Sequence, residues 1–191
     1  MARVKIYAEQ QIQRINHLIN ELEEIRTNGN LLRERPNEKA WSSIEVIRHM
    51  SIGHQAYQKN VSNALSQLKE ALPAEFIVAK GVPSFLIKRF PPQEEGKIKF
   101  KMKTTKMFKP VYSDEEIGKM DLNPIIDELK NGLFELKSWV EDYRTKEAAS
   151  KRFDSALGPI VRFNVAEACE FILCHNERHF QQIRNNLKTK S

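Results

Sequence analysis

The sequence predicts an all-α protein, a four-helix bundle with a long crossover between helices 2 and 3. Four segments repeat their apolar residues at spacings of three and four, which is the period of one helical face. Three of these segments open on residues that cap a helix N-terminus. No set of alternating strands is convincing, and 191 residues suit one domain, so we expect a single helical domain over residues 1–191.

The first two predicted helices cover residues 5–26 and 42–71. Gly29 is expected to follow the first in a left-handed conformation, because glycine adopts positive φ without steric cost. The second opens on a capping box, in which Ser42 and Glu45 satisfy free backbone N–H groups. Each helix carries an apolar stripe; that of the first consists of Ile12, Ile15, Leu18, Ile19, Leu22 and Ile25.

The other two predicted helices cover residues 123–143 and 164–187. The third begins at Asn123, a capping residue, and Pro124 takes the first helical position, where its missing N–H does no harm. The fourth begins at Asn164, with a glutamate three residues later as its capping partner. Both segments are apolar on one side and can bury that face against the other helices.

Residues 73–120, between the second and third helices, do not follow this regular plan. A structureless loop of this length is unusual inside a compact domain, so we expect a partly ordered crossover packed over one end of the bundle. Ile98, Phe100 and Met102 alternate with lysines and predict a short extended piece. Ser113, followed by three acidic residues, predicts the start of a short helix.

The net charge of +6 comes almost wholly from one segment. Six of the 31 basic residues lie between Lys97 and Lys109 in a run without acidic residues, and the remaining 25 balance the 25 acidic ones. A nucleic-acid-binding face needs a wider basic footprint, so we expect no nucleic-acid partner. No apolar run is long enough to span a membrane. With two cysteines and no apolar signal core, we expect a cytoplasmic protein.

The most informative motif is a pair of histidines, His175 and His179, in the fourth predicted helix. At a spacing of four they lie one turn apart on the same face, which also carries the apolar stripe. Imidazoles that face a core must be hydrogen-bonded or bound to a metal, because unpaired polar groups are costly to bury. Both a metal site and an ordinary pair of core histidines fit this pattern. Glu177 points away from both rings, so the motif is not the H-E-x-x-H metalloprotease signature.

A metal site requires a third ligand from another segment. His49, at the edge of the apolar stripe of the second helix, is the natural candidate, because an edge position can meet a neighbouring helix. His54 lies nearer the middle of that stripe; it is the weaker candidate, and we expect a packed core histidine there. His17 is expected to face solvent. Cys169 and Cys174 are poorly placed for a disulfide with each other, and we expect Cys169 to be buried and Cys174 to be exposed.

These segments resemble the DinB-like family. The run WSSIEVIRH (residues 41–49) is similar to the start of that family's second helix, and HNERHFQQI (residues 175–183) is similar to its last helix. The resemblance covers nearly the whole chain and implies a four-helix bundle that holds a divalent metal on His49, His175 and His179. Nickel or zinc is the usual metal, and three imidazoles also suit iron or manganese. It further implies frequent homodimers and, in several relatives, thiol transfer with a low-molecular-weight thiol such as bacillithiol or mycothiol.

We therefore expect a metal-dependent thiol S-transferase or hydrolase that acts on a small-molecule substrate. An open divalent metal makes a bound thiol or water nucleophilic at neutral pH. Glu45 and Gln182 are candidates to orient the histidines through their other ring nitrogens, and no catalytic residue is identified. One alternative is a non-catalytic metal- or small-molecule-binding bundle. Another is a partner-binding or membrane-surface module that uses the Lys97–Lys109 segment.

Overall fold

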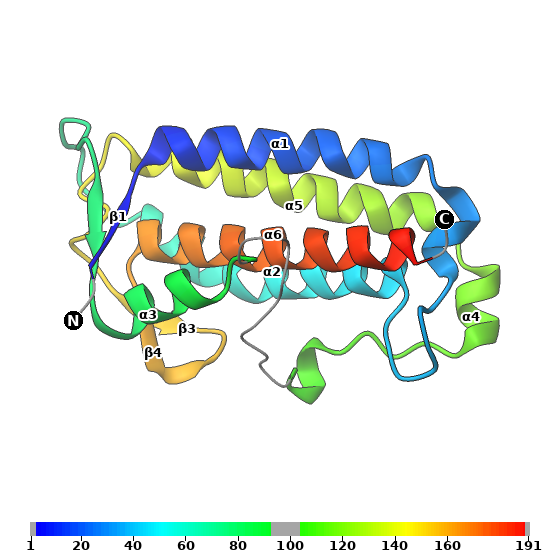
Figure 1. Ribbon diagram of the computed structural model, residues 1–191. Helices are drawn as coiled ribbons and strands as arrows, with labels where there is room; N and C mark the ends of the chain where they lie inside the picture. The colour runs from blue at the N-terminus through cyan, green and yellow to red at the C-terminus, as the bar shows by residue number, and fades with distance from the viewer. Residues whose placement is uncertain (1–2, 93–103, 190–191) are drawn as a thin grey trace.

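The structure is a computed structural model that describes residues 3–92 and 104–189 of the chain. It is predominantly helical, as predicted, and Figure 1 shows its long helices running side by side. The two C-terminal helices match their predicted ranges to within one residue, whereas the first starts later and the second ends earlier than expected. These long helices are α1 (Ala8–Arg26), α2 (Ser43–Leu65), α5 (Leu122–Tyr143) and α6 (Val165–Lys188).

Each long helix buries an apolar face against its neighbours. Helix α2 packs against α5 and α6, and α1 packs against the same two helices. In α5 the buried residues recur every three or four positions and include Ile126, Leu129, Leu133, Leu136 and Val140. Truncation of one such leucine to alanine typically costs about 2–5 kcal/mol of unfolding free energy. The shared core between these helices is what holds α2 and α6 in direct contact.

Side-chain caps begin the helices largely where the sequence predicts them. The side chains of Ser42 and Asn164 each accept a hydrogen bond from the backbone N–H three residues on, at the starts of α2 and α6. Ser113 caps the short helix predicted there. The prediction that Asn123 caps α5 is wrong. Asp121 is the cap, and its carboxylate accepts a hydrogen bond of 3.1 Å from the Asn123 N–H, because the first helical residue is Leu122, two positions before Pro124.

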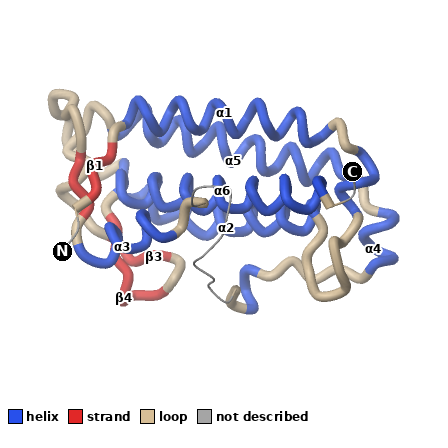
Figure 2. Tube along the Cα trace, viewed as in Figure 1, coloured by secondary structure: helices blue, strands red, loops and turns tan. Residues whose placement is uncertain are grey.

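Two small antiparallel sheets correct the expectation of a purely helical chain. In the first, β1 (Val4–Ile6) pairs with β2 (Ile77–Ala79), and in the second, β3 (Phe153–Ser155) pairs with β4 (Gly158–Phe163). Three of these strands have only three residues, which is too short for the alternation that marks a strand in a sequence. Figure 2 shows both sheets at the end of the long helices where α1 begins.

The remaining helical pieces are short and lie in the connections. Gly29 has a φ of 54°, as predicted for the turn after α1. The crossover between α2 and α5 contains two short helices and a 3-10 turn within its described residues. The pieces are the 3-10 turn η1 (Gly29–Arg33) after α1, and in the crossover α3 (Gly81–Arg89), the 3-10 turn η3 (Lys106–Phe108) and α4 (Asp114–Lys119).

The crossover runs along the long helices from one end to the other. Near the start of α1, the rings of Tyr7 and Phe76 lie 5.7 Å apart. Beyond the end of α1, Arg33 donates a hydrogen bond to the backbone carbonyl of Ile117. The prediction that the crossover packs over one end of the bundle is therefore wrong, because contacts of its described residues lie at both ends of α1. The extended piece predicted at residues 98–102 lies outside the described residues.

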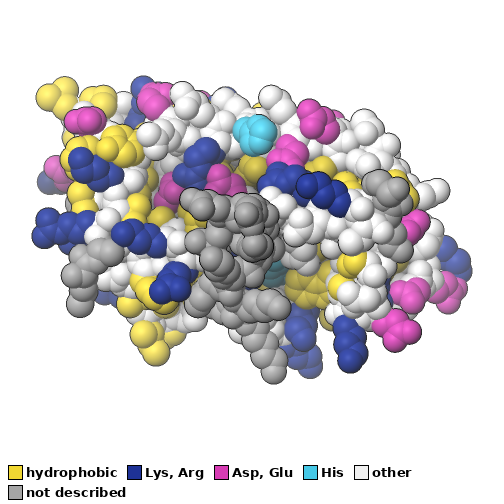
Figure 3. All heavy atoms as spheres, in the orientation of Figure 1, with side chains coloured by type: hydrophobic (Ala, Val, Ile, Leu, Met, Phe, Trp, Pro, Cys, Tyr) yellow, Lys and Arg dark blue, Asp and Glu magenta, His cyan; other side chains and the backbone are white. Residues whose placement is uncertain are grey.

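Charge is mixed on the visible surface of the molecule. On the face shown in Figure 3, basic and acidic side chains are interspersed. This agrees with the balance of basic and acidic residues outside the lysine-rich segment, Lys97–Lys109. Residues 97–103 of that segment lie outside the described residues. Of the helices that the structure describes, none combines the length and the apolar character that a membrane crossing requires.

Candidate metal centre

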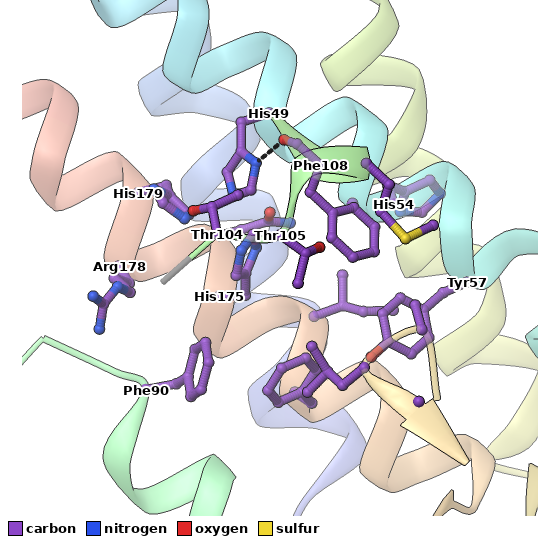
Figure 4. Close-up of a pocket in the computed structure, with 18 residues that line it drawn as sticks. His49, His54, Tyr57, Phe90, Thr104, Thr105, Phe108, His175, Arg178 and His179 are labelled. Atoms are coloured by element: carbon purple, nitrogen blue, oxygen red, sulfur yellow. Dashed lines mark hydrogen bonds between the residues drawn. The ribbon is translucent and has the colours of Figure 1, made fainter. Parts of the chain in front are cut away.

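The structure brings His49, His175 and His179 together. His49 lies on α2 and the other two lie on α6, the helix that packs directly against α2. One ring nitrogen from each residue lies within 4.8 Å of the others. The ring centroids are 5.2 Å apart for His49 and His175, 4.8 Å for His49 and His179, and 4.5 Å for His175 and His179. Figure 4 shows the three rings converging at one wall of a cavity.

Local structure accounts for this convergence. His175 and His179 are one helical turn apart on α6, so their side chains leave the helix in nearly the same direction. His49 lies on the second turn of α2, which begins at the capping box, and the packing of α2 on α6 turns it toward the pair. His49 and His179 are buried, whereas His175 is partly exposed where the cavity opens onto it.

Hydrogen bonds fix the protonation of two of the rings. His49 Nδ1 lies 2.7 Å from the backbone carbonyl of Phe108 in η3, and His179 Nδ1 lies 3.0 Å from Gln182 Oε1. Both partners are oxygen acceptors, so each Nδ1 carries the proton and donates it. The Nε2 atoms of both rings therefore keep a free lone pair. A metal-bound histidine needs this arrangement, in which one nitrogen coordinates and the other donates to a polar neighbour.

The surroundings keep all three imidazoles neutral near pH 7. Burial, with the nearby His49 and Arg178, lowers the pKa of His175 to about 3. Burial and the neighbouring His175 and His49 lower the pKa of His179 well below its usual value. The pKa of His49 is also lowered by burial, against the opposing effect of its bond to Phe108. Neutral imidazole is the form that binds a metal, so the electrostatics suit coordination.

The donor set fits one divalent ion. Zinc–nitrogen bonds are about 2.0–2.1 Å long, and nickel, iron, copper and zinc all accept imidazole ligands. The ring nitrogens lie within 4.8 Å of one another, and coordination of one ion by all three requires the rings to move inward. Three protein ligands leave further coordination positions for water or substrate, as in catalytic zinc sites, whereas structural zinc sites are closed by four.

A cavity of about 530 Å³ lies against the three histidines. This volume is in the range of sites for small organic ligands. Most of the residues that line the cavity are apolar or aromatic. Arg178 also lines it, and its guanidinium carbon lies 5.7 Å from the centroid of the Phe90 ring. The other apolar wall residues are Tyr57, Met107, Phe108, Ala156, Leu157, Phe171 and Ile172. An apolar site of this kind excludes water from a bound ligand and strengthens polar contacts inside it.

The two residues expected to orient the histidines have different roles. Gln182 accepts the His179 hydrogen bond, as the sequence predicted. The prediction for Glu45 is wrong. Its carboxylate accepts from the Ser42 backbone at 2.8 Å and from Arg35 at 2.8 and 3.0 Å, so the helix cap and an ion pair occupy it. A carboxylate held by its own N-cap faces back along the helix, away from a residue four positions on.

His54 lies outside the cluster, as expected of a packed core histidine. Its ring stacks on Trp139 of α5 with centroids 4.8 Å apart and planes 7° apart. Its Nε2 lies 2.7 Å from a carboxylate oxygen of Glu135. His17 also follows its prediction, with 76% of its side chain exposed on α1.

The two cysteines are free, and both are buried. The expectation that Cys174 is exposed is wrong, because α1 covers that side of α6. Arg14 of α1 donates to Glu177 and Glu170 at 2.7 Å and reaches the Cys174 sulfur at 3.6 Å. Burial raises the pKa of the Cys169 and Cys174 thiols, so neither is a nucleophile near neutral pH.

Some features of the site have no signal in the sequence. The Phe108 carbonyl that holds His49 is a backbone group, and any residue supplies one. Trp41 contacts His49, with ring centroids 5.1 Å apart, and this explains the tryptophan eight residues before it. A Cβ at Gly53 would lie 3.7 Å from His175 Cε1, an ordinary van der Waals distance, so α2 passes close beside this ring.

Comparison of the chain with models of protein families, with curated proteins and with solved structures finds no match. The geometry of the three histidines and of the cavity beside them therefore carries the functional argument.

Proposed function

We propose that this chain is a divalent-metal-binding protein of the DinB-like kind, in which His49, His175 and His179 hold nickel or zinc. We propose further that its long helices form the four-helix bundle of that family, and that it acts as a metal-dependent thiol S-transferase or hydrolase. One observation supports the proposal above all. Three neutral imidazoles from two helices bring their ring nitrogens within 4.8 Å at the wall of an apolar cavity.

In such a site, different residues of the chain have different roles. A divalent metal lowers the pKa of a bound thiol or water, so that a nucleophile is present at neutral pH. The Phe108 carbonyl and Gln182 hold the rings of His49 and His179 in the tautomer that leaves Nε2 free. The apolar walls around Phe171 and Phe90 position an electrophilic substrate and keep bulk water away from it.

Metal analysis tests the first half of the proposal. Protein purified without a histidine tag is incubated with nickel, zinc, iron or manganese, and bound metal is measured after desalting. We expect one equivalent in the wild type and a loss of affinity of about 100-fold or more in His175→Ala. His17→Ala is the matched control, because His17 is exposed on α1 and its loss leaves the site intact. Wild-type protein that binds none of these metals would contradict the proposal.

Turnover assays separate catalysis from simple binding. The metal-loaded protein is offered a chloro-aromatic and an epoxide electrophile with a panel of thiols, including bacillithiol and mycothiol. Thiol consumption that is lost in His175→Ala supports the transferase. Bound metal without turnover across the panel favours the second candidate, a non-catalytic metal- or small-molecule-binding bundle, because the same geometry binds a metal without reacting.

Three further expectations stay predictions. A homodimer is checked by light scattering coupled to gel filtration. A cytoplasmic location is checked by fractionation of cells. Contact of the Lys97–Lys109 segment with a membrane surface is checked by liposome binding of a variant in which Lys99, Lys101 and Lys103 are changed to Glu.

A further inference from the structure

The described residues 104–109 of the crossover lie along one side of the cavity, and we call this segment the strap. It contains the 3-10 turn η3. Figure 4 shows its labelled residues beside His49. Because the strap forms part of the cavity wall, a displacement of the strap would widen the cavity. Its members in the cavity lining are Thr104, Thr105, Met107 and Phe108.

Little packing holds the strap in place. None of the residues of η3 is buried, and Met107 is 71% exposed. Phe108 is partly buried but does not belong to the hydrophobic core that the described residues form. Two backbone hydrogen bonds of 3.1 and 3.3 Å lie within the strap itself and close its turn. A segment with so few buried apolar contacts opens at a free energy well below that of global unfolding.

His49 connects the strap to the long helices. Its Nδ1 donates to the Phe108 carbonyl at 2.7 Å, and among the described residues this is the one hydrogen bond between the strap and a long helix. His49 is 5% exposed and lies in the second turn of α2, so the packing of that helix fixes its position. Opening of the strap takes the acceptor away from a buried N–H, which is costly. His49 therefore acts as a latch that favours the closed strap.

The latch depends on which nitrogen of His49 carries the proton. A neutral imidazole has one proton, on either nitrogen, and only the Nδ1–H form can donate to the Phe108 carbonyl. When Nε2 coordinates a metal, the proton must lie on Nδ1, because a coordinating nitrogen uses its lone pair. Hydrogen bonds beside a positive charge are also stronger. Coordination at Nε2 therefore favours the closed strap, and by linkage the closed strap favours metal binding by the same factor.

We propose that the strap closes the cavity when the metal site is filled, with His49 as the latch. The dependence on metal rests on the proposed function, whereas the latch is a property of the metal-free chain. In the metal-free chain the strap opens more often, which widens the cavity for entering ions and ligands. In the metal-loaded chain the closed strap keeps Met107 and Phe108 in the cavity wall and helps to exclude water.

Hydrogen–deuterium exchange followed by mass spectrometry tests the latch in metal-free protein. The exchange rate is measured for peptides that cover the strap, in which the Phe108 and Lys109 amides are hydrogen-bonded. We expect about tenfold faster exchange in His49→Phe than in the wild type, as the loss of one hydrogen bond gives. His175→Ala is the matched control, because it removes a neighbouring imidazole that does not bond the strap. Peptides of α4, in the same crossover, should exchange alike in all three proteins.

A second arm with zinc tests the dependence on metal. Zinc is added at a concentration that saturates the wild type only. It is expected to slow exchange of the strap peptides about tenfold in the wild type and to leave α4 unchanged. The rate in His175→Ala should stay the same, because this variant keeps the latch but lacks a metal ligand.

The two arms separate this inference from the proposed function. If the wild type binds zinc and its strap exchanges no more slowly, the inference is overturned while the metal site stands. If the wild type binds no zinc, the proposed function fails and the metal-free arm decides on the latch. Faster exchange in His49→Phe alone then supports it, and equal exchange in all three proteins overturns it. His49→Ala takes the place of His49→Phe if that variant does not fold.

Discussion

His49 Nδ1 lies 2.7 Å from the backbone carbonyl of Phe108, so a 3-10 turn of the crossover sets the orientation of a histidine on α2. The crossover is thus part of the candidate site as well as a connection between helices. Gln182 does the same for His179 from within α6. The two acceptors differ in origin, one a backbone group and one a side chain, and only the second is removable by substitution.

Gln182→Leu should weaken metal binding without unfolding the protein. The change removes the acceptor that holds the His179 ring, and loss of such a partner typically costs about 10- to 100-fold in metal affinity. Zinc affinity is measured by competition with a chromophoric chelator. Gln181→Leu is the control, because Gln181 bonds Asn185 and not a histidine. Equal affinity in both variants would show that Gln182 does not support His179.

Glu170→Ala should destabilise the fold while the metal affinity stays the same. Glu170 accepts hydrogen bonds from Gln11 at 2.8 Å and from Arg14 at 2.7 Å, which join α1 to α6 on the side away from the cavity. Its removal leaves the buried Gln11 amide without this acceptor and leaves Arg14 paired with Glu177 alone, which is expected to cost about 2 kcal/mol of unfolding free energy in urea. Glu141→Ala, in an exposed pair with Lys137, should change the stability by less than about 0.5 kcal/mol.

Gly132→Ala should destabilise the protein although alanine favours helices. The new Cβ would lie 3.2 Å from the His54 ring, which cannot retreat because Trp139 and Glu135 hold it. Overpacking of about 1–3 kcal/mol then outweighs a gain of about 1 kcal/mol in helix propensity. Gly118→Ala in α4 meets no atom within 4 Å and should stabilise. The melting temperatures of both variants are compared with that of the wild type. A Gly132→Ala variant that is more stable than the wild type would mean that His54 is free to move.

Acidification should remove a part of the stability that depends on His54. Burial lowers its folded-state pKa below the unfolded value of about 6.5, so the unfolded chain binds the proton first. The contribution of His54 is therefore fully present above pH 6.5 and is lost as the pH falls below it, by at most about 1.4 kcal/mol per pH unit. Urea unfolding at pH 7 and pH 5 should show a larger loss for the metal-free wild type than for metal-free His54→Gln. An equal loss in both proteins would exclude a lowered pKa.

Several features of the site could be predicted from the sequence because they follow from the period of a helix. A spacing of four places His175 and His179 on one face of α6, and a spacing of three adds Gln182 to that side. The apolar stripes indicate which faces turn inward, so His49 could be selected as the third member of the group. Caps and turns defined most of the helix boundaries, because capping depends on neighbouring residues alone.

Other features depend on contacts between residues that are distant in the sequence. Three-residue strands form because a partner strand supplies their hydrogen bonds, and β1 finds its partner more than 70 residues away. Cys174 is buried because Arg14, a charged residue, reaches across from α1 to two glutamates beside it. The sequence by itself determined the helices and the three histidines, since these follow from local periodicity. Only the tertiary structure decided that Phe108 holds His49, and that His54 and Tyr57 meet the cavity, because packing sets which groups lie side by side.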